Sequence, residues 1–488
     1  MTEIQKIIVG YAVNAVYLLL VILFGEMLNK KFKVNSETSR KIEHLLTGAN
    51  WIFVYLFFGT TIHTFIFGVL CLITLILLTF AVKLESANRE GHKYSLGLVY
   101  YGISSAILSA LVSFVDGNWL PIYGIAYYCL ALGDGFAPII AKSVNKKHNP
   151  LIFEGKSIVG TFSVFAICTA VAFVFNALFN LELSVLFIFS IGCLAALAEI
   201  YGANGTDNLT IPLLVFLYLV LYINGHITLA IQLAIVLSLP FNVLSGLTKS
   251  LSFSATALSF IYVVGTAIFG GLEILVTVFV LYFIAAIVSK FTTKKFNEIS
   301  QSIKAKAIRK WKQIFSNSIV ALVFCILSYA CNQPIFLFAA LAVLSEEFAD
   351  SISSDIGRLS KKPPIDILRF QRISRGISGG VSLLGLSSGF LASLVATSIP
   401  YAFYPEFTVT FLVVLVVSFL GTIIDSILGS SIQVLYKCPK CNSFTEKRMH
   451  CDTQAVQVKG LACVDNSMVN LLSGLFTGLI TVLVLFLI

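Results

Sequence analysis

The sequence predicts an all-α protein that crosses a membrane many times and has almost no soluble domain. Of its 488 residues, 58% are hydrophobic and only 12% are charged, whereas soluble proteins average about 25% charged residues. The mean hydropathy of +0.93 excludes a water-soluble enzyme, a disordered chain and a coiled coil. Apolar runs of membrane-spanning length recur along the chain, and we expect them to be helices because lipid offers the backbone no hydrogen-bond partner.

The apolar runs predict about 16 transmembrane helices in two halves. The first run is longer than the apolar core of a signal peptide, and no small-residue cleavage site follows it, so we expect it to be a membrane helix. The expected helices span residues 7–28, 43–60, 61–82, 95–114, 119–141, 157–179, 183–201, 209–223, 227–245, 252–269, 271–289, 313–331, 334–349, 377–399, 408–433 and 468–488.

Basic residues lie almost entirely in alternate connections between these helices. Of the 33 Lys and Arg residues, only Lys6 falls outside that set of connections and their edges. The positive-inside rule places this basic side in the cytoplasm and both termini outside. We therefore expect a multi-pass protein of the plasma (inner) membrane whose sites face the cytoplasm. The net charge of +9 is explained by this topology and by anionic lipid headgroups, so no nucleic-acid partner is expected.

Acidic side chains at the ends of apolar helices are the strongest functional signal, because an ionisable group at membrane depth is costly to bury. They face loops rich in Lys, Arg and Gly, and this combination is typical of a site for Mg²⁺ and a nucleotide. A transporter would instead hold its acids near the bilayer midplane, and hydrogen bonding between helices is the alternative explanation for each acid. The acids concerned are Asp134, Glu199, Asp207, Glu346, Glu347, Asp350, Asp355, Asp425 and Asp465.

Four motifs follow one another in the first half of the chain. They are RKIEHLLTG (residues 40–48), GDGFA (133–137), GKSIVGTF (155–162) and, after Glu199, GTDNLTIPL (205–213). With these motifs, residues 1–225 resemble the CTP-dependent lipid kinases, which include phytol kinase, dolichol kinase and their cytidylyltransferase relatives. Val159 stands where dolichol kinase and the cytidylyltransferases usually carry Glu, so the form is nearer to phytol kinase. Pro138 also departs from the family, which usually has an acid there.

This resemblance implies a prenol kinase that uses CTP as phosphoryl donor and Mg²⁺ as cofactor. It implies Mg²⁺ ligands at Asp134 and Asp207, with Glu199 and Asn208 as further ligands or their supports. His44 is expected either to polarise the prenol hydroxyl or to make a hydrogen bond in helix packing. The residues implied to stabilise the transferring phosphoryl group or to hold the nucleotide are Arg40, Lys41, Gly133, Gly135, Lys156, Ser157, Gly160 and Thr161.

A different set of motifs marks the second half. The matching stretches include SEEFADSISSDIG, RGISGGVSLLG, GTIIDSILGSSIQ, YKCPKC and CVDNSMVNLL. Residues 226–488 thereby resemble the transmembrane protein 19 group, which includes phytyl-phosphate kinase. The resemblance implies a kinase that acts on a prenyl monophosphate, and such an anionic nucleophile needs no general base. The expected Mg²⁺ ligands are Asp350, Asp355 and Asp425, with Asp465 as a further candidate beside the catalytic residue Asn466. Two anions must be brought together at this site, so we expect phosphate binding by residues of the basic and Gly-rich loops, namely Arg309, Lys312, Arg375, Gly379, Gly380 and Ser382.

The two halves share the order of their motifs. RKIEHLLTG corresponds to RKWKQIFSN, so that Gln313 takes the place of His44. Each half continues with an acidic helix end, a Gly-rich loop, a second acidic helix end and an Asp-Asn pair. This shared order gives the hypothesis of an ancient internal duplication.

A Cys/His-rich segment lies in the expected cytoplasmic loop 434–467. CPKC is followed by a His-Cys pair, a spacing that fits tetrahedral zinc. A disulfide is disfavoured on the cytoplasmic side. Two interpretations stay open, a loop-clamping zinc site and a coincidence without a metal, and the residues concerned are Cys438, Cys441, His450 and Cys451.

Together these features predict a bifunctional membrane kinase for isoprenoid alcohols of the phytol, geranylgeraniol or farnesol type. The first half would make the monophosphate and the second half the diphosphate, within the bilayer, as a monomer or an oligomer. Two alternatives stay open. One is a CTP-dependent phosphatidate-type cytidylyltransferase, and the other, from another class, is a lipid-phosphate transporter or flippase.

Overall fold

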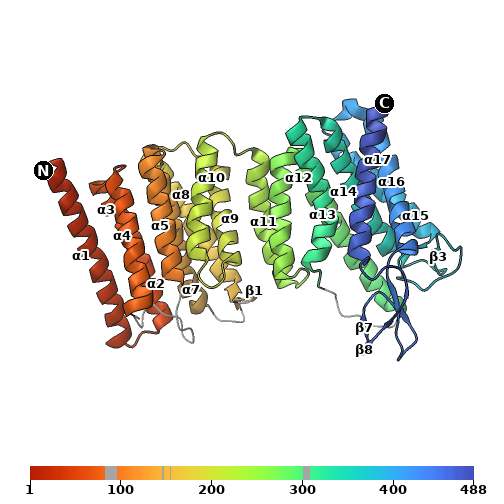
Figure 1. Cartoon of the computed structure of the whole chain (residues 1–488), viewed down its shortest axis with the longest axis horizontal. Coiled ribbons are helices and arrows are strands. Elements are labelled where there is room, and N and C mark those ends of the chain that lie inside the picture. The colour runs from red at the N-terminus through yellow and green to blue at the C-terminus, as the bar shows by residue number, and fades with distance from the viewer. Residues whose placement is uncertain (83–95, 145–147, 154, 301–307) are drawn as a thin grey trace. The chain divides into compact units, whose positions relative to one another are not determined.

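The computed structural model describes the chain except for residues 83–95, 145–147, 154 and 301–307. Helices make up most of it, and short strands are confined to the connections (Figure 1). The chain divides into two compact units, Met1–Thr248 and Lys249–Ile488. This division lies later than the expected one between residues 225 and 226, because the helix that follows residue 225 belongs to unit 1. In that helix, Asn242 accepts a hydrogen bond from the Tyr201 hydroxyl.

Unit 1 is a set of helices with one short hairpin on its connections. η3 is a π-helical turn that separates α6 from α7, and such turns are frequent at functional sites. The elements are α1 (Glu3–Lys30), α2 (Ser36–Gly48), α3 (Asn50–Phe57), α4 (Ile62–Leu77), η1 (Leu78–Val82), α5 (Gly97–Phe114), η2 (Gly117–Trp119), α6 (Leu120–Tyr128), η3 (Cys129–Asp134), α7 (Gly135–Ser143), antiparallel β1 (Leu151–Phe153) and β2 (Lys156–Ser157), α8 (Ile158–Phe179), α9 (Val185–Tyr201), α10 (Asp207–Ile223) and α11 (Leu229–Leu247).

Unit 2 combines long helices with three small antiparallel sheets. The sheets have the strand orders β3-β4, β6-β5-β9 and β7-β8. The helices are α12 (Phe253–Ser300), α13 (Trp311–Cys331), α14 (Pro334–Gly357), α15 (Leu383–Tyr401), η5 (Pro405–Phe407), α16 (Thr408–Ser431) and α17 (Asn466–Leu487). The strands are β3 (Ile365–Asp366), β4 (Gly380–Val381), β5 (Leu435–Lys437), β6 (Phe444–Thr445), β7 (Met449–His450), β8 (Thr453–Gln454) and β9 (Val456–Lys459).

The protein is a multi-pass helical membrane protein, as its composition predicts. Within the described ranges, eleven helical segments are long and apolar enough to cross a membrane, and α9 and α10 are shorter apolar helices. α12 contains both the expected helices 252–269 and 271–289, which are separated by a break at Gly271 with φ of 76°. The count of sixteen helices and the outward position of the termini stay predictions.

The expected helix 43–60 is not one continuous apolar helix. The amphipathic helix α2 ends at Gly48, and the eight-residue helix α3 begins at Asn50. The polar residues of RKIEH explain the difference, because they give α2 a hydrophilic face that an apolar span would lack. This amphipathic helix carries three of the expected catalytic residues, Arg40, Lys41 and His44.

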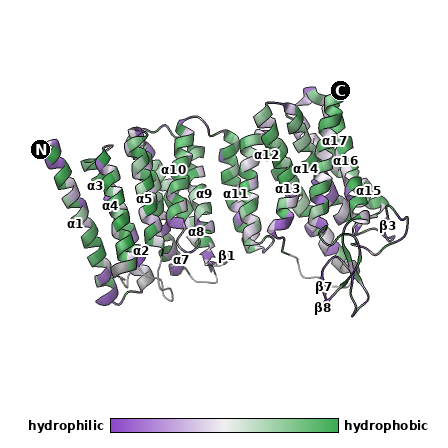
Figure 2. Ribbon diagram, viewed as in Figure 1, coloured by the Kyte–Doolittle hydropathy of each residue, from purple (hydrophilic) through white to green (hydrophobic). Residues whose placement is uncertain are grey.

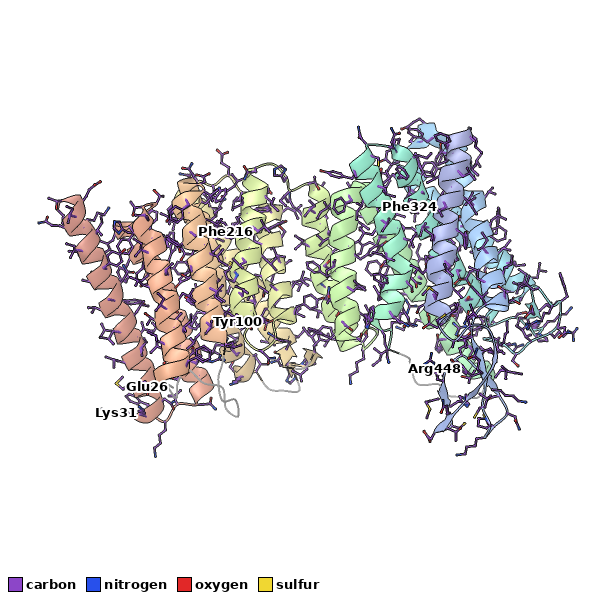
Figure 3. All side chains as sticks on the ribbon, viewed as in Figure 1. Glu26, Lys31, Tyr100, Phe216, Phe324 and Arg448 are labelled. Carbon is purple, nitrogen blue, oxygen red and sulfur yellow. The ribbon has the colours of Figure 1, made fainter. Side chains whose placement is uncertain are left out.

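Hydrophobic residues cover most of each helix, and hydrophilic residues concentrate at helix ends and in the connections (Figure 2). Figure 3 shows Phe216 and Phe324 within the helices, and Arg448 in the segment that holds β7 and β8. In unit 2, Phe324 belongs to a buried apolar cluster with Phe338 and Phe411. Large apolar side chains also lie exposed on α1, such as Ile8 and Leu19. Lipid contact accounts for this exposure in a membrane-spanning helix.

Each unit contains a short hairpin directly before a helix that a serine caps. In unit 1 the hairpin β1-β2 precedes α8, and Ser157 accepts a hydrogen bond from the backbone N–H of Gly160. In unit 2 the strands β3 and β4 precede α15, and Ser382 accepts one from Gly385. Side-chain caps of this kind satisfy backbone donors that the first helical turn leaves unpaired. In both units, therefore, a serine of the Gly-rich motif caps the helix that follows.

Candidate functional site

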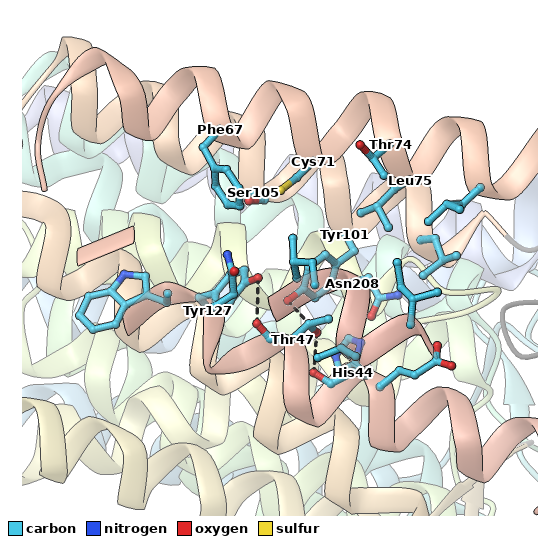
Figure 4. A pocket seen from close by; sticks show the side chains of 18 of the residues that line it. His44, Thr47, Phe67, Cys71, Thr74, Leu75, Tyr101, Ser105, Tyr127 and Asn208 are labelled. Carbon is cyan, nitrogen blue, oxygen red and sulfur yellow. Dashed lines mark hydrogen bonds between the residues drawn. The ribbon is translucent and has the colours of Figure 1, made fainter. Parts of the chain in front are cut away.

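An elongated cavity of about 510 Å³ lies in unit 1, between helices α1, α2, α4 and α5. Figure 4 shows Phe67 and Cys71 along α4, with Thr47 and His44 on α2 on the other side. Its lining is apolar around residues such as Trp51 and Val54, and it is polar where motif residues enter it. The motif residues in the lining are Arg40, Lys41, His44, Asp134, Asp207 and Asn208.

The Asp134 carboxylate is the centre of the polar part of this cavity. Lys41 Nζ lies 2.6 Å from Asp134 Oδ2 and also donates to the Asp134 carbonyl over 3.1 Å. His44 Nε2 lies 3.7 Å from the same Oδ2 and 3.2 Å from the Leu130 carbonyl oxygen. Lys41 and His44 reach the same carboxylate because residues three apart share one face of a helix. The motifs RKIEH and GDG therefore form one site.

A second cluster of charges surrounds Lys156 at the end of β2. Lys156 Nζ lies 2.7 Å from Glu199 Oε1 and 3.8 Å from Asp207 Oδ2. Burial opposes the charge of this lysine, but the two carboxylates outweigh that effect and raise the pKa of Lys156. The two carboxylates therefore favour the charged form of Lys156. Glu199 stands near the end of α9 and Asp207 begins α10, so the short connection between the helices brings both acids to the hairpin.

Among the described residues near these charges, the buried oxygens Glu199 Oε2 and Asn208 Oδ1 lack a hydrogen-bond partner. The side-chain nitrogen Nδ2 of Asn208 donates to the Gly97 carbonyl oxygen over 2.9 Å, so the side-chain oxygen Oδ1 points away from Gly97. An unpaired buried oxygen is costly unless a ligand satisfies it. These atoms fit the oxygen ligands that Mg²⁺ takes in proteins.

The glycines and the helix cap of unit 1 already have structural roles. A Cβ added to Gly133 would lie 2.7 Å from Cys168 Sγ, and one added to Gly135 would lie 2.6 Å from Leu45. The Gly160 N–H binds the Ser157 hydroxyl. The Thr161 hydroxyl, by contrast, is buried without a partner. A binding role for the expected nucleotide residues here stays a prediction, with Thr161 the one that has an unused polar atom.

Lys156 gives a stability prediction for unit 1. Replacing Lys156 by Met should lower the apparent melting temperature of the detergent-solubilised protein, because Glu199 and Asp207 would lose a buried cation. Loss of one partner from such a group costs about 3–5 kcal/mol. Lys156→Arg is the control and should retain most of the stability, and Lys156→Met with Glu199→Gln should recover part of the loss. Equal melting temperatures for the Met and Arg variants would contradict this assignment.

In unit 2, acidic side chains gather where α14, α16 and α17 pack together. Glu346 is buried, and a Cβ added to Gly421 of α16 would lie 2.5 Å from its side chain, so the glycine makes room for it. Glu346 interacts electrostatically with Asp350 and Asp425. Ser473 of α17 donates to Asp425 Oδ2 over 3.4 Å. The oxygen Glu346 Oε2 is buried without a hydrogen-bond partner, as are Glu199 Oε2 and Asn208 Oδ1 in unit 1.

Two of the expected acids of unit 2 are already paired with cations. Asp355 forms an ion pair with Arg358 in the last turn of α14. Lys312 Nζ lies 3.1 Å from Asp465 Oδ2, and the other oxygen of Asp465 caps α17 by accepting from Met468. Among the expected acids, Asp350 and Asp425 are therefore the ones that the structure brings together in the buried cluster. Asp355 and Asp465 lie at the ends of their helices.

The Gly-rich loop of unit 2 packs closely against the end of α16. Gly379 has φ of +85°, and a Cβ there would lie 2.6 Å from the Ser430 backbone, so this position accepts glycine alone. Ser378 donates to Glu446 Oε1 over 2.6 Å and to Asn466 Oδ1 over 3.4 Å. The loop thus joins three segments that lie far apart in the sequence.

The expected phosphate-binding cations of unit 2 differ in their surroundings. The Arg375 guanidinium donates to the carbonyl oxygens of Ser360 and Lys361 over 2.7 and 3.0 Å. The backbone of Arg309 bonds to Ser250 and Ser252 near the start of α12. Arg375 therefore has a role in holding the connection after α14, and phosphate binding by either residue stays a prediction.

Three residues of these sites were missed by the sequence reasoning. Asp366 is buried and accepts hydrogen bonds from Ser430 and from the backbone of Leu368 and Arg369. Burial would raise its pKa, but these donors outweigh burial and lower the pKa of Asp366. An Asp that accepts hydrogen bonds from backbone N–H groups two and three residues later is a common turn pattern. This pattern could have been found in the sequence. Ser378 and Glu446 meet through tertiary folding, and no local pattern predicts their contact.

Comparison with known proteins gives one match to a family of integral membrane proteins and two relatives of low identity. Residues 236–478 match the family described as integral membrane protein DUF92. Protein PGR of Arabidopsis thaliana is 26% identical over 219 residues, which are 40% of this chain and 75% of that protein. Phytol kinase of Synechocystis sp. is 29% identical over 215 residues, which are 42% of this chain and 88% of that protein. The chain is similar to phytol kinase over part of its length. No solved structure matches it.

Proposed function

We propose that this protein is a bifunctional kinase that phosphorylates a prenol in unit 1 and the resulting prenyl monophosphate in unit 2. The observation that carries this proposal is the cavity of unit 1, which joins an apolar part to the Lys41–Asp134 pair. An isoprenoid alcohol has the same two parts, a long apolar tail and one hydroxyl group. The similarity to a phytol kinase supports the same substrate class.

In unit 1 the prenol tail would lie against Trp51, Val54 and Phe67, with its hydroxyl toward His44 and Asp134. The cavity volume of about 510 Å³ is within the range of small-molecule sites. His44 would accept a hydrogen bond from the hydroxyl or take its proton as the phosphoryl group arrives. Since phosphoryl transfer depends mainly on positioning and charge neutralisation, a strong base is not required.

The donor would be CTP bound with Mg²⁺ beside this cavity. Asp134 and Asp207 would hold the ion, with Asn208 and Glu199 supplying the two unpaired oxygens. When bound, the ion neutralises charge on the donor phosphates. Lys41 and Arg40 would stabilise the transferring phosphoryl group, and Lys156 would bind a donor phosphate. The ion pairs favour the charged form of Lys156, which is the form that binds an anion.

In unit 2 the acceptor would be the monophosphate that unit 1 releases. Asp350 and Asp425 would hold Mg²⁺ in the acidic cluster, and the unpaired Glu346 Oε2 lies in the same cluster. Asp355 and Asp465 would become ligands only after release from Arg358 and Lys312. The nucleophile is already an anion, so this site would need no general base. Gln313, which cannot act as a base, stands in the position that corresponds to His44 and agrees with this expectation.

The proposal includes the arrangement of the chain in the membrane. The sites would face the cytoplasm of the plasma (inner) membrane, sixteen helices would cross it, and both termini would lie outside. The two hairpins before Ser-capped helices support the hypothesis that the halves arose by duplication. A monomer and an oligomer are both compatible with sites that lie within single units.

Cys71 gives a prediction about prenol chain length. Replacing Cys71 by Phe should narrow the cavity between α4 and α2 and raise the KM for the C20 prenols phytol and geranylgeraniol more than that for the C15 prenol farnesol. Cys71→Ala is the matched control and should leave the ratio of kcat/KM values unchanged. Initial rates with both alcohols measure this ratio. An equal loss for both alcohols would show that the tail does not occupy this part of the cavity.

The cytidylyltransferase alternative uses the same kind of site and differs in the phosphorus attacked. With CTP labelled separately at the α- and γ-phosphates, a kinase transfers the γ label to the lipid and releases CDP. A cytidylyltransferase transfers the α label and releases pyrophosphate. A lipid-phosphate transporter or flippase would transfer neither label. The assay therefore separates all three functions with one purified protein.

A further inference from the structure

The Cys/His segment between α16 and α17 brings four metal-ligating side chains to one place. Cys438, Cys441, His450 and Cys451 each offer one ligand atom, and these atoms all lie within 4.8 Å of one another. His450 Nδ1 lies 3.4 Å from Cys441 Sγ and 3.3 Å from Cys451 Sγ. Zinc–ligand bonds of about 2.3 Å to sulfur and about 2.0 Å to nitrogen place such atoms about 3.5 Å apart in a tetrahedron.

The backbone of this segment adopts unusual conformations to bring the ligands together. Cys451 and Asp452 form the two-residue turn between β7 and β8, with φ of 51° and 58°. Turns of this type require positive φ at both central residues and strongly favour Asn-Gly. Asn442, directly after Cys441, also has a positive φ of 56°. Asn and Asp tolerate this conformation, whereas a residue such as Cys451 holds it only where its surroundings determine it.

The segment has little other means of holding itself together. Its strands have two to four residues, and its buried apolar cluster consists of Val434, Tyr436 and Ala455. Small folded segments with so little core commonly depend on a metal ion or on disulfides. The cysteines of the chain are free thiols in the structure.

We propose that Cys438, Cys441, His450 and Cys451 bind one zinc ion, and that this ion holds Glu446 against the Gly-rich loop of unit 2. Glu446 directly follows strand β6, and Arg448 lies two residues after Glu446. Arg448 donates to the Tyr436 hydroxyl and to the Ala462 carbonyl. Glu446 in turn accepts from both the N–H and the hydroxyl of Ser378. The zinc ion thereby fixes the segment that contacts the loop. A role of this clamp in phosphoryl transfer rests on the proposed function, whereas the metal site does not.

Metal analysis of the purified full-length protein tests the site. Wild-type protein purified without a metal-affinity tag should contain one zinc per chain. Cys441→Ser and Cys451→Ser should each lose most of it, while the control Cys463→Ser, an exposed cysteine of the same segment, should keep it. Cobalt added to the zinc-free protein should give the visible absorption of a tetrahedral thiolate site. Wild-type protein that neither contains zinc nor binds it when zinc chloride is added under reducing conditions would overturn the proposal.

Hydrogen exchange tests the clamp without any nucleotide or lipid substrate. Removing the zinc with a chelator should speed exchange in the peptides that cover residues 376–381 and 444–460, because the Ser378 N–H bonds to Glu446. A peptide from α8 in unit 1 serves as the control and should not change. Unchanged exchange in both unit 2 peptides would overturn the clamp even if zinc is bound. Neither readout depends on kinase activity, so failure here is distinct from failure of the proposed function.

Discussion

Replacing Asp134 by Asn should abolish conversion of a prenol to its monophosphate and leave conversion of supplied prenyl monophosphate to the diphosphate intact. Asp134 is the buried carboxylate that Lys41 and His44 both approach, and it is a proposed Mg²⁺ ligand. Loss of one such electrostatic group reduces kcat by about 100-fold or more. Separate initial rates with geranylgeraniol and with geranylgeranyl monophosphate measure the two steps.

The second step is also the folding control for this variant. Because Asp134 lies in unit 1 and the second site lies in unit 2, retained activity on the monophosphate shows that the protein is folded. Glu182→Gln changes an exposed acid in the connection between α8 and α9 and should affect neither step. Normal first-step activity in Asp134→Asn would remove Asp134 from the mechanism.

Replacing Asp425 by Asn should have the opposite effect and cause prenyl monophosphate to accumulate. Asp425 interacts with Asp350, and together they are the proposed Mg²⁺ ligands of unit 2. The diphosphate should fall by about 100-fold or more for the same electrostatic reason, while the monophosphate forms at the wild-type rate. Resolving the two lipid products over time measures both effects.

Glu406→Gln is the matched control, because Glu406 is an exposed acid of unit 2 in the short helix η5. It should give the wild-type ratio of monophosphate to diphosphate. If Asp134→Asn also lost the conversion of supplied monophosphate, and Asp425→Asn also lost formation of the monophosphate, the two units would act as a single functional site. That result would contradict the division of the reaction between them.

The meeting of distant motifs could be predicted from the sequence, because each motif carries its own charge pattern. Lys41 and Asp134 are 93 positions apart and form a buried ion pair. RKIEH and GDG each place a charge beside apolar residues, where it needs a partner of the opposite sign. The resemblance to the CTP-dependent lipid kinases implied that Lys156, Glu199 and Asp207 lie in one site, and the structure brings their side chains together.

The pairing of individual acids could not be predicted in the same way. Asp350 and Asp355 look alike in the motif SEEFADSISSDIG, yet Asp355 pairs with Arg358 whereas Asp350 joins the buried cluster. The difference depends on which helix face meets α16 and α17, and that is a property of tertiary packing. The end of unit 1 was also missed, because the bond from Tyr201 to Asn242 joins α11 to α9 without a local signal.

The break in the expected helix 43–60 has a different cause. The hydropathy of the apolar run favours one membrane span that begins at residue 43. The charged face of α2, however, begins before residue 43, because α2 starts at Ser36. A reading by apolar runs alone cannot separate an amphipathic helix from the apolar helix that continues it. The functional consequence is that Lys41 and His44 come from a helix with a hydrophilic face, which fits their place at the polar part of the cavity.

Conversion of a free prenol to its diphosphate by one chain, in two successive steps, is tested by a time course with purified protein, geranylgeraniol and CTP labelled at the γ-phosphate. We expect labelled monophosphate first, followed by diphosphate with two labelled phosphates per prenol, and CDP as the nucleotide product. Lipid without γ label, or pyrophosphate as the released product, would contradict this expectation.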